Sequence, residues 1–319
     1  MSARVFVTGA SGVLGRATVP RLVAAAWSVT AVARTADAAA DLVTVGATPV
    51  TVDLFDADAV VAAVAGHGAV MHLATSIPPL AQMRKRAAWA TNDRLRVDAT
   101  RHLIAAARVH GIERVVKESI TFPYLDGGER WLDEDAPLDA ADAWSATLAG
   151  EQLVAGFTAD GAAGVVLRFG ALYAADARAT AEYRALARRR IAPMPGRADA
   201  FVSSIHADDA AAALVLALDV PAGTYNVVDD RPVRRREYAD AFATAFATPP
   251  LHLVPGGMMR AVGGDGARGL TASQRVTNAA FRGVTGWMPV WADVTVGWPA
   301  VAARLAGASG LHDVMEEGA

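Results

Sequence analysis

Three glycines at three-residue intervals near the start of the chain have the spacing most specific for chemistry. They lie in the run Thr8-Gly-Ala-Ser-Gly-Val-Leu-Gly15, which follows a β-type segment at residues 4–7 and opens a helical pattern at residues 16–26. Gly9 permits a tight turn, Gly12 lets the backbone approach a pyrophosphate, and Gly15 lets the helix pack closely on the strand. The helix N-terminus then offers free N–H groups to phosphate.

Strand, glycine turn and helix in this order predict a dinucleotide-binding loop. The alternative is a tight strand–helix connection that binds nothing. If the loop binds a cofactor, we expect its contacts to be Gly9, Ser11, Gly12, Val13, Leu14 and Gly15.

A basic residue ends the second predicted strand, at residues 29–33. In a nicotinamide-binding sheet this position faces the adenosine ribose. A carboxylate there favours the 2′-hydroxyl of NAD, and an arginine accommodates the 2′-phosphate of NADP. Because Arg34 stands there with no acid beside it, we expect NADP rather than NAD. The alternative is a solvent-exposed surface arginine.

Two later strand ends complete the predicted cofactor site. Asp53 follows the third strand, at residues 49–52, and is a candidate to hydrogen-bond the adenine amino group or to cap the helix that starts near Asp56. The fourth strand, at residues 69–73, is followed by small residues that leave room for the nicotinamide ribose. These small residues are Ala74, Thr75 and Ser76.

Strands and helices alternate through the first half of the chain. Further strands are expected at residues 114–118 and 164–169, with one long helix at residues 83–110 and another at 143–159. Six alternations predict an α/β fold with a doubly wound parallel sheet. His72 lies within an apolar strand, so we interpret it as a core histidine.

Composition restricts the class of protein. The chain has 319 residues, 53% of them hydrophobic and 20% charged, so it can bury a large core. A net charge of −3 gives no reason to expect nucleic acid or an anionic membrane as partner. No apolar run approaches the roughly 18 residues that a membrane span needs. We therefore expect a cytoplasmic protein that acts on a small molecule.

Metal and thiol chemistry have no support in the sequence. The chain has no cysteine, which excludes disulfides, thiolate nucleophiles and cysteine-bound zinc. Three consecutive acids, Asp133, Glu134 and Asp135, precede Pro137, and such a cluster is more typical of a surface loop than of a metal site. We predict no metal.

These motifs, in this order, resemble the extended short-chain dehydrogenase/reductase superfamily, of the nucleotide-sugar epimerase and dehydratase type. The glycine loop is similar to its TGxxGxxG motif, Asp53-Leu54 to its adenine contact, and His72-Leu73-Ala74 to the motif after its fourth strand. Later segments match its LRxxxxYG, I/V-H-V-D-D and GWxP motifs; these are residues 167–173, 205–209 and 286–289.

The resemblance implies an NAD(P) cofactor and two domains. A Rossmann-type domain would comprise residues 1–173 and about 205–228. A smaller C-terminal substrate domain would comprise residues 174–204 and 229–308, with a flexible tail at 309–319. Helices near 83–110 and 143–159 resemble the dimer face of the family, which implies a homodimer.

The chain departs from the family where its chemistry occurs. The family uses a serine or threonine with a tyrosine and a lysine, and the tyrosine transfers the proton. Ser119 matches the serine, but Trp144 and Leu148 stand where Tyr-x-x-x-Lys should be. An indole N–H has no usable acidity near neutral pH, and leucine carries no charge. The usual proton relay therefore cannot operate.

The remaining residues predict an NAD(P)-dependent oxidoreductase of atypical mechanism. Ser119 and Thr121 would hold a substrate oxygen, while Tyr124, Tyr173 or water would supply a proton. Ser76 with the apolar Trp144 and Leu148 would form a pocket for a hydrophobic or aromatic substrate.

Several alternatives stay open. They are a non-redox isomerase, dehydratase or cyclase on the same pocket, a non-catalytic NAD(P)-binding sensor or scaffold, and a fold relic that binds no dinucleotide. Gly170, where sugar-nucleotide enzymes commonly carry asparagine, disfavours that substrate class. Lys117 is the last lysine of the chain and lies in the fifth strand, with a direction that the sequence does not give.

Overall fold

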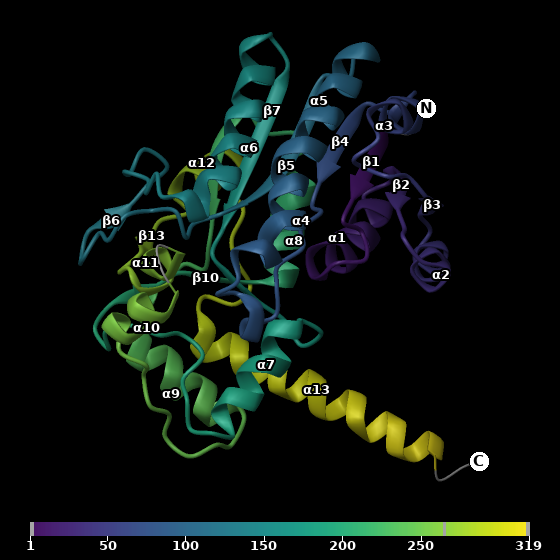
Figure 1. Cartoon of the computed structure of the whole chain (residues 1–319). Helices are drawn as coiled ribbons and strands as arrows, with labels where there is room; N and C mark the ends of the chain where they lie inside the picture. Colours follow the sequence, from purple (N-terminus) through teal and green to yellow (C-terminus); the bar gives the residue numbers. More distant parts are fainter. Residues whose placement is uncertain (1–2, 264–265, 317–319) are drawn as a thin grey trace.

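A seven-stranded parallel sheet forms the centre of the computed structural model, which describes residues 3–263 and 266–316 (Figure 1). The strand order is β11-β7-β5-β4-β1-β2-β3, and every neighbouring pair is parallel. The strands are β1 (Arg4–Thr8), β2 (Ser28–Val32), β3 (Thr48–Val50), β4 (Ala69–His72), β5 (Arg114–Ile120), β7 (Ala163–Phe169) and β11 (Gly223–Val227). The doubly wound α/β prediction is confirmed.

Helices cover both faces of this sheet because its strands are apolar on both sides. On β1, Val5 and Val7 pack against α1 (Val13–Ala24), α2 (Ala36–Thr44) and α8 (Ala207–Leu216). Phe6 points to the opposite face of the sheet, where a second layer of helices packs. The helices of this second layer are α3 (Ala57–Val64), α5 (Thr100–Val109) and α6 (Asp142–Ala159). The strand order reverses between β1 and β4, and folds of this type bind ligands at such a point.

The long helix expected at residues 83–110 is interrupted. The chain forms short turns at Leu80–Gln82 and Arg86–Trp89, then α4 (Ala90–Arg94), then a π-helical turn at Leu95–Ala99, and only then α5. The wider π turn leaves the carbonyl of Leu95 to accept a hydrogen bond from outside the helix, from His72 Nε2 at 3.0 Å. Tertiary contact with the fourth strand therefore overrides the helical pattern that the sequence shows.

A second lobe lies below the sheet in Figure 1 and has its own aromatic core around Tyr173, Tyr238, Phe242 and Trp298. Its elements come from the region that we expected to hold the substrate domain. The helices of this lobe are α7 (Arg178–Ala187), α9 (Arg235–Ala245), α10 (Gly256–Gly263), α11 (Gly266–Thr271) and α13 (Val294–Glu316). The remaining helix, α12 (Ala279–Thr285), lies beside the sheet instead, and its Phe281 packs in the sheet core (Figure 1).

Short two-stranded pairs connect the lobes. In the first, β8 (Ala171–Tyr173) pairs in parallel with β10 (Ser204–His206); in the second, β9 (Phe201–Val202) pairs antiparallel with β12 (Val233–Arg234). The third joins β6 (Trp131–Leu132) to β13 (Arg275–Val276). Ser203 separates β9 from β10, and its hydroxyl donates to Gln274 O at 3.0 Å.

The C-terminal segments are largely helical. Residues 249–269 contain α10 and most of α11, with 264–265 outside the described residues. The segment expected as a flexible tail from residue 309 is helical to Glu316, and residues 317–319 lie outside the described part. Among the helices that the structure describes, none combines the length and apolarity needed to cross a membrane.

Candidate cofactor and active site

The glycine loop between β1 and α1 has the geometry that a dinucleotide needs. Gly9 has a φ of +73°, and a Cβ there would lie 2.4 Å from the carbonyl carbon of Leu73. A Cβ on Gly15 would lie 2.3 Å from Gly9 O. Gly12 begins α1 without any side-chain cap, so the first-turn amides are left to a ligand. These residues fit a pyrophosphate.

The end of β4 lies against this loop. Leu73 N donates to Thr8 O at 3.1 Å, which places Leu73 and Ala74 beside Gly9. Thr75 is exposed and Ser76 is half-buried, with the Ser76 amide held by Asn92 Oδ1 at 3.1 Å. The structure therefore brings these predicted nicotinamide-side residues next to the glycine loop.

On the adenine side, Arg34 follows β2 and Asp53 follows β3, and both are exposed. The open question about Asp53 is partly answered, because Asp56 caps α3 by accepting from the amides of Asp58 and Ala59 at 3.1 Å. Asp53 Oδ1 accepts only from Phe55 N, at 2.9 Å, among the described residues. Leu54 is buried beneath it. The carboxylate of Asp53 therefore remains available to an adenine amino group.

Trp144, which the sequence predicts at the position of the family's tyrosine, lies on α6 and is nearly buried. Its ring stacks on Phe122, with 6.4 Å between centroids and 21° between planes. Gly269 of α11 packs on the same ring, since a Cβ there would lie 2.6 Å from Trp144 Cζ2. In the described part of the chain, the indole Nε1 has no hydrogen-bond partner. Leu148, one turn later, is half-buried. The surroundings of Trp144 are thus apolar and aromatic.

Ser119 of β5 is completely buried and its hydroxyl is already used. Its Oγ donates to Glu151 Oε1 on α6 at 2.5 Å. Glu151 also accepts from Arg168, at 3.0 Å from Nε and 2.7 Å from Nη2. Arg168 Nη1 donates to the Tyr124 hydroxyl at 2.8 Å, and that hydroxyl donates to Asn226 Oδ1 at 2.9 Å. The structure therefore joins Ser119 and Tyr124 in one buried network, which we call the Glu151–Arg168 network.

The electrostatics of the Glu151–Arg168 network do not favour proton transfer near neutral pH. Burial opposes the charge on Arg168, but the Glu151 carboxylate more than compensates, so the pKa of Arg168 is raised. Burial also raises the pKa of Tyr124, which Arg168 opposes only in part. A tyrosine acid catalyst needs the reverse shift.

Thr121 and Tyr173 lie elsewhere. Thr121 is buried just after β5, where its amide donates to Phe169 O at 3.0 Å. Tyr173 points into the second core, with its ring 5.0 Å from Trp298 and 5.2 Å from His206. Burial, with a contribution from Asp229, raises the pKa of Tyr173. Tyr173 thus belongs to a different core from Ser119 and Tyr124.

Lys117 points toward α6 and is fully buried. Its Nζ donates to Glu118 O at 3.0 Å, and a Cβ on Gly150 would lie 2.8 Å from Lys117 Cε. Burial, with help from Arg96, lowers the pKa of Lys117 to about 8. His72 is buried and bonded at both nitrogens, to Thr8 Oγ1 at 2.6 Å and to Leu95 O, and burial lowers its pKa to about 3. His72 is therefore a neutral core histidine.

Sequence reasoning missed three members of the Glu151–Arg168 network: Glu151, Arg168 and Asn226. Glu151 lies one helical turn beyond Leu148 and therefore shares its face of α6, which was a usable indication. Arg168 and Asn226 lie on neighbouring strands, and their pairing through β7 and β11 depends on the sheet order.

Comparison with known proteins agrees with this geometry. The model of the NAD dependent epimerase/dehydratase family matches residues 5–228. A 3-diazoavenalumate denitrifying reductase from a Streptomyces species is 35% identical over 307 residues, which is 91% of this chain and 98% of that protein.

Solved structures share the fold over nearly the whole chain. MoeE5 in complex with UDP-glucose and NAD has a TM-score of 0.76 at 22% identity and covers 96% of this chain and 99% of its own. Human epimerase family protein SDR39U1 (isoform 2) with NADPH has a TM-score of 0.75 at 22% identity, covering 95% and 100%.

The fold and the glycine loop define a nicotinamide-cofactor protein of Rossmann type. The chain belongs to the NAD dependent epimerase/dehydratase family. The expected relationship to the extended dehydrogenase/reductase superfamily is confirmed, and a relative named as a reductase supports oxidoreductase-type chemistry. Neighbours carry both NAD and NADPH, so the preference for NADP stays a prediction.

Proposed function

We propose that this chain is an NADP(H)-dependent reductase whose acceptor requires no proton from the protein. The observation that carries the proposal is the replacement of the proton relay by Trp144 and Leu148 at the end of the sheet. The buried, fully engaged hydroxyl of Ser119 adds to it. A ketone reduced by hydride becomes an alkoxide and needs a proton donor, so ketones suit this site poorly.

Residues already described would hold the cofactor. The loop Gly9–Gly15 would bind the pyrophosphate, Arg34 the 2′-phosphate, Asp53 and Leu54 the adenine, and residues 73–75 the nicotinamide side. When bound in its reduced form, the cofactor supplies a hydride. The protein contributes position and exclusion of water, and these account for much of the acceleration of such a transfer.

An aryl diazonium ion is an acceptor that fits. It already carries a positive charge, and addition of hydride with loss of dinitrogen gives the neutral arene (Ar–N₂⁺ + H⁻ → Ar–H + N₂) without any added proton. The Streptomyces relative, whose name describes denitrifying reduction of a diazo compound, supports this class of substrate. We therefore propose an aromatic diazonium ion as substrate.

The chain's own residues would bind the ring rather than ionise. Phe122 and Trp144 form a stacked aromatic pair against which the ring would lie, and Ser76 and Leu148 would complete the wall. The Glu151–Arg168 network would keep Ser119 and Tyr124 in place behind this wall. On this proposal these two residues and Thr121 position the pocket, and Tyr173 stabilises the second core.

The test uses 4-methoxybenzenediazonium as probe. We expect enzyme-dependent oxidation of NADPH with equal amounts of anisole and N₂, and a kcat that is constant between about pH 6 and 9 because no protein group donates a proton. The double variant Trp144→Tyr, Leu148→Lys restores the relay residues and is expected not to raise this rate.

The same experiment separates the alternatives. A rate no higher than the no-enzyme control, or faster reduction of benzaldehyde than of the diazonium ion, would defeat the proposal. Tight NADP binding without turnover of any acceptor would instead favour a cofactor-binding sensor, which the loss of both relay residues also motivates.

A further inference from the structure

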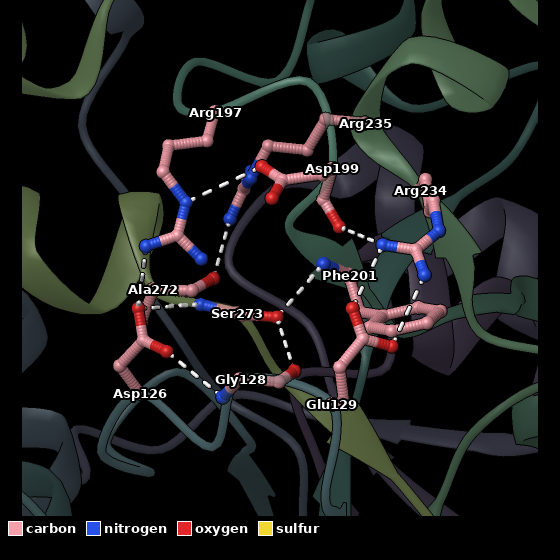
Figure 2. Close-up of polar contacts among 10 residues, drawn as sticks. All are labelled: Asp126, Gly128, Glu129, Arg197, Asp199, Phe201, Arg234, Arg235, Ala272 and Ser273. Atoms are coloured by element: carbon pink, nitrogen blue, oxygen red, sulfur yellow. Dashed lines mark hydrogen bonds and ion pairs between the residues drawn. The ribbon is translucent and has the colours of Figure 1, made fainter.

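Arg235, at the start of α9, is a buried cation with most of its hydrogen-bonding capacity unused. The residue is 2% exposed. Its Nη2 donates to Ala272 O at 2.7 Å, the one contact of this side chain drawn in Figure 2. Within residues 3–263 and 266–316, Nε and Nη1 have no acceptor. Burying guanidinium N–H groups without acceptors is strongly unfavourable. Such groups therefore indicate that a ligand supplies the acceptor.

The charge of Arg235 is also left uncompensated. Burial lowers its pKa to about 10, and the neighbouring Arg197 opposes the charge too, while Asp126 offsets these effects only in part. Both oxygens of Asp126 are engaged by backbone amides, those of Gly128 at 2.9 Å and Ser273 at 3.2 Å. Arg235 stays cationic at neutral pH, and no carboxylate within residues 3–263 and 266–316 forms an ion pair with it.

The adjacent arginine differs from Arg235 in this respect. Arg234 donates to both oxygens of Glu129, at 3.0 Å each, and to Asp199 O at 2.6 Å (Figure 2). Its side chain is 43% exposed, so it needs such partners less than Arg235 does. The chain therefore places acids beside the surface arginine and leaves the buried one open to an external anion.

The position of Arg235 links it to the proposed ring site. Gly196, with a φ of +126°, lets its loop come so close that a Cβ there would be 2.8 Å from Arg235 Nε. On the other side, Ala272 directly follows α11. Three residues earlier, Gly269 contacts Phe122 O and the Trp144 ring. The last turn of α11 thus touches the ring-binding pair at one end and Arg235 at the other, about 5 Å of helix apart.

We infer that Arg235 recognises a carboxylate on the aromatic substrate, so that the enzyme acts on aromatic acids whose ring lies against Phe122 and Trp144. This inference rests on the proposed function and adds the substrate class. A guanidinium matches the geometry and charge of a carboxylate, and the pairing would supply the missing anion. Since Nε and Nη1 are closed to solvent in the structure, this recognition requires residues packed around them to move when the acid binds.

The experiment measures binding rather than turnover. Isothermal titration of the NADP⁺-loaded protein with 4-hydroxycinnamate and with its methyl ester compares a charged ligand with a neutral one that carries one additional methyl group. We expect the acid to bind at least about tenfold more tightly than the ester, as a charged hydrogen-bonded pair would give. Arg235→Met should abolish this preference while leaving the affinity for the ester unchanged.

A matched control is available in the next residue. Arg234→Met makes the same chemical change on the exposed, fully paired arginine and should retain the preference for the acid. Ligand-free Arg235→Met should unfold at the same temperature as the wild type or higher, because it removes an unpaired buried charge. A structural role for Arg235 predicts the opposite, a lower unfolding temperature.

Three results would overturn the inference: a wild type that does not distinguish acid from ester, an Arg235→Met variant that keeps the preference, or unfolding of both Arg235→Met and Arg235→Gln. Its failure can be told apart from failure of the proposed function. Loss of the acid preference in Arg235→Met supports the carboxylate site even if no diazonium compound is reduced. Diazonium reduction by a protein indifferent to the carboxylate supports only the proposed function.

Discussion

The two sides of the carboxyl end of the sheet differ in what determines their function. On the side of β1 and α1, the cofactor loop has three glycines, and two of them cannot accept a Cβ without striking backbone. On the side of β5 and α6, the relay positions hold Trp144 and Leu148, and the nearby polar groups are locked into the Glu151–Arg168 network. Cofactor binding depends on backbone geometry, whereas the chemistry depends on side chains that can be exchanged on a fixed scaffold.

The largest expected effect tests the cofactor side. Gly15→Ala puts a Cβ 2.3 Å from Gly9 O, so the loop must move. We expect NADP affinity to fall at least about 100-fold and the free energy of unfolding to fall by about 1–3 kcal/mol. Calorimetry and urea unfolding measure both. The control is Gly156→Ala in α6, where nothing lies within 4 Å; there stability should be unchanged or rise by about 0.5–1 kcal/mol. Unaltered NADP binding in Gly15→Ala would contradict the proposed loop contact.

The next prediction concerns the side of β5 and α6, where the Glu151–Arg168 network lies. Glu151→Ala removes the partner of the buried Arg168 and the acceptor of Ser119. We expect the free energy of unfolding to fall by about 3–5 kcal/mol, because a buried charge is left unpaired. Asp160→Ala, which breaks the exposed pair with Arg108, should cost less than about 1 kcal/mol. Equal losses in the two variants would show that the Glu151–Arg168 network has no special structural role.

The pH dependence of stability tests another buried charge on the side of β5 and α6, that of Lys117. The pKa of buried Lys117 is lowered from 10.5 to about 8, so the unfolded chain binds more protons than the folded one between these values. The free energy of unfolding should therefore rise with pH in this window, by roughly 1–3 kcal/mol, and Lys117→Met should remove that rise. Urea titrations at pH 7.5, 9 and 10 measure it. The same slope in both proteins would contradict a buried, charged Lys117.

The smallest effect concerns cofactor choice. Arg34→Ala should weaken NADP binding about tenfold, equivalent to about 1.4 kcal/mol, and leave NAD binding unchanged. Arg101→Ala, an exposed arginine on α5 that pairs with Asp98, should change neither affinity. Equal losses for NAD and NADP would remove the basis for preferring NADP.

Local patterns predicted the cofactor side well. The strand boundaries lie within two residues of expectation, and the glycine loop lies where the strand–turn–helix order placed it. These features depend on residues close together in the chain. The interruption at residues 83–110 was not predictable in this way, because it depends on His72 of β4 bonding Leu95 O.

The side of β5 and α6 was predicted less well, because it too depends on contacts between residues that are distant in the chain. Sequence identified Ser119 and Tyr124 as polar residues near the sheet end but not the arginine and glutamate that connect them. Glu151 and Arg168 meet because α6 packs on β7, which no short pattern reveals. Arg235 appeared in the sequence as one of three consecutive arginines, and only the fold shows that it is the buried one.

The strand order has a consequence for synthesis of the chain. Residues 163–169 stay an open edge until residues 223–227 emerge from the ribosome and pair with them, and by then part of the second lobe has already been made. Nascent chains that stop short of residue 223 therefore carry a bare hydrogen-bonding edge that invites association with other chains. A fragment ending at residue 222 should accordingly elute as aggregates in size-exclusion chromatography, and a monomeric peak would show that the final strand is dispensable.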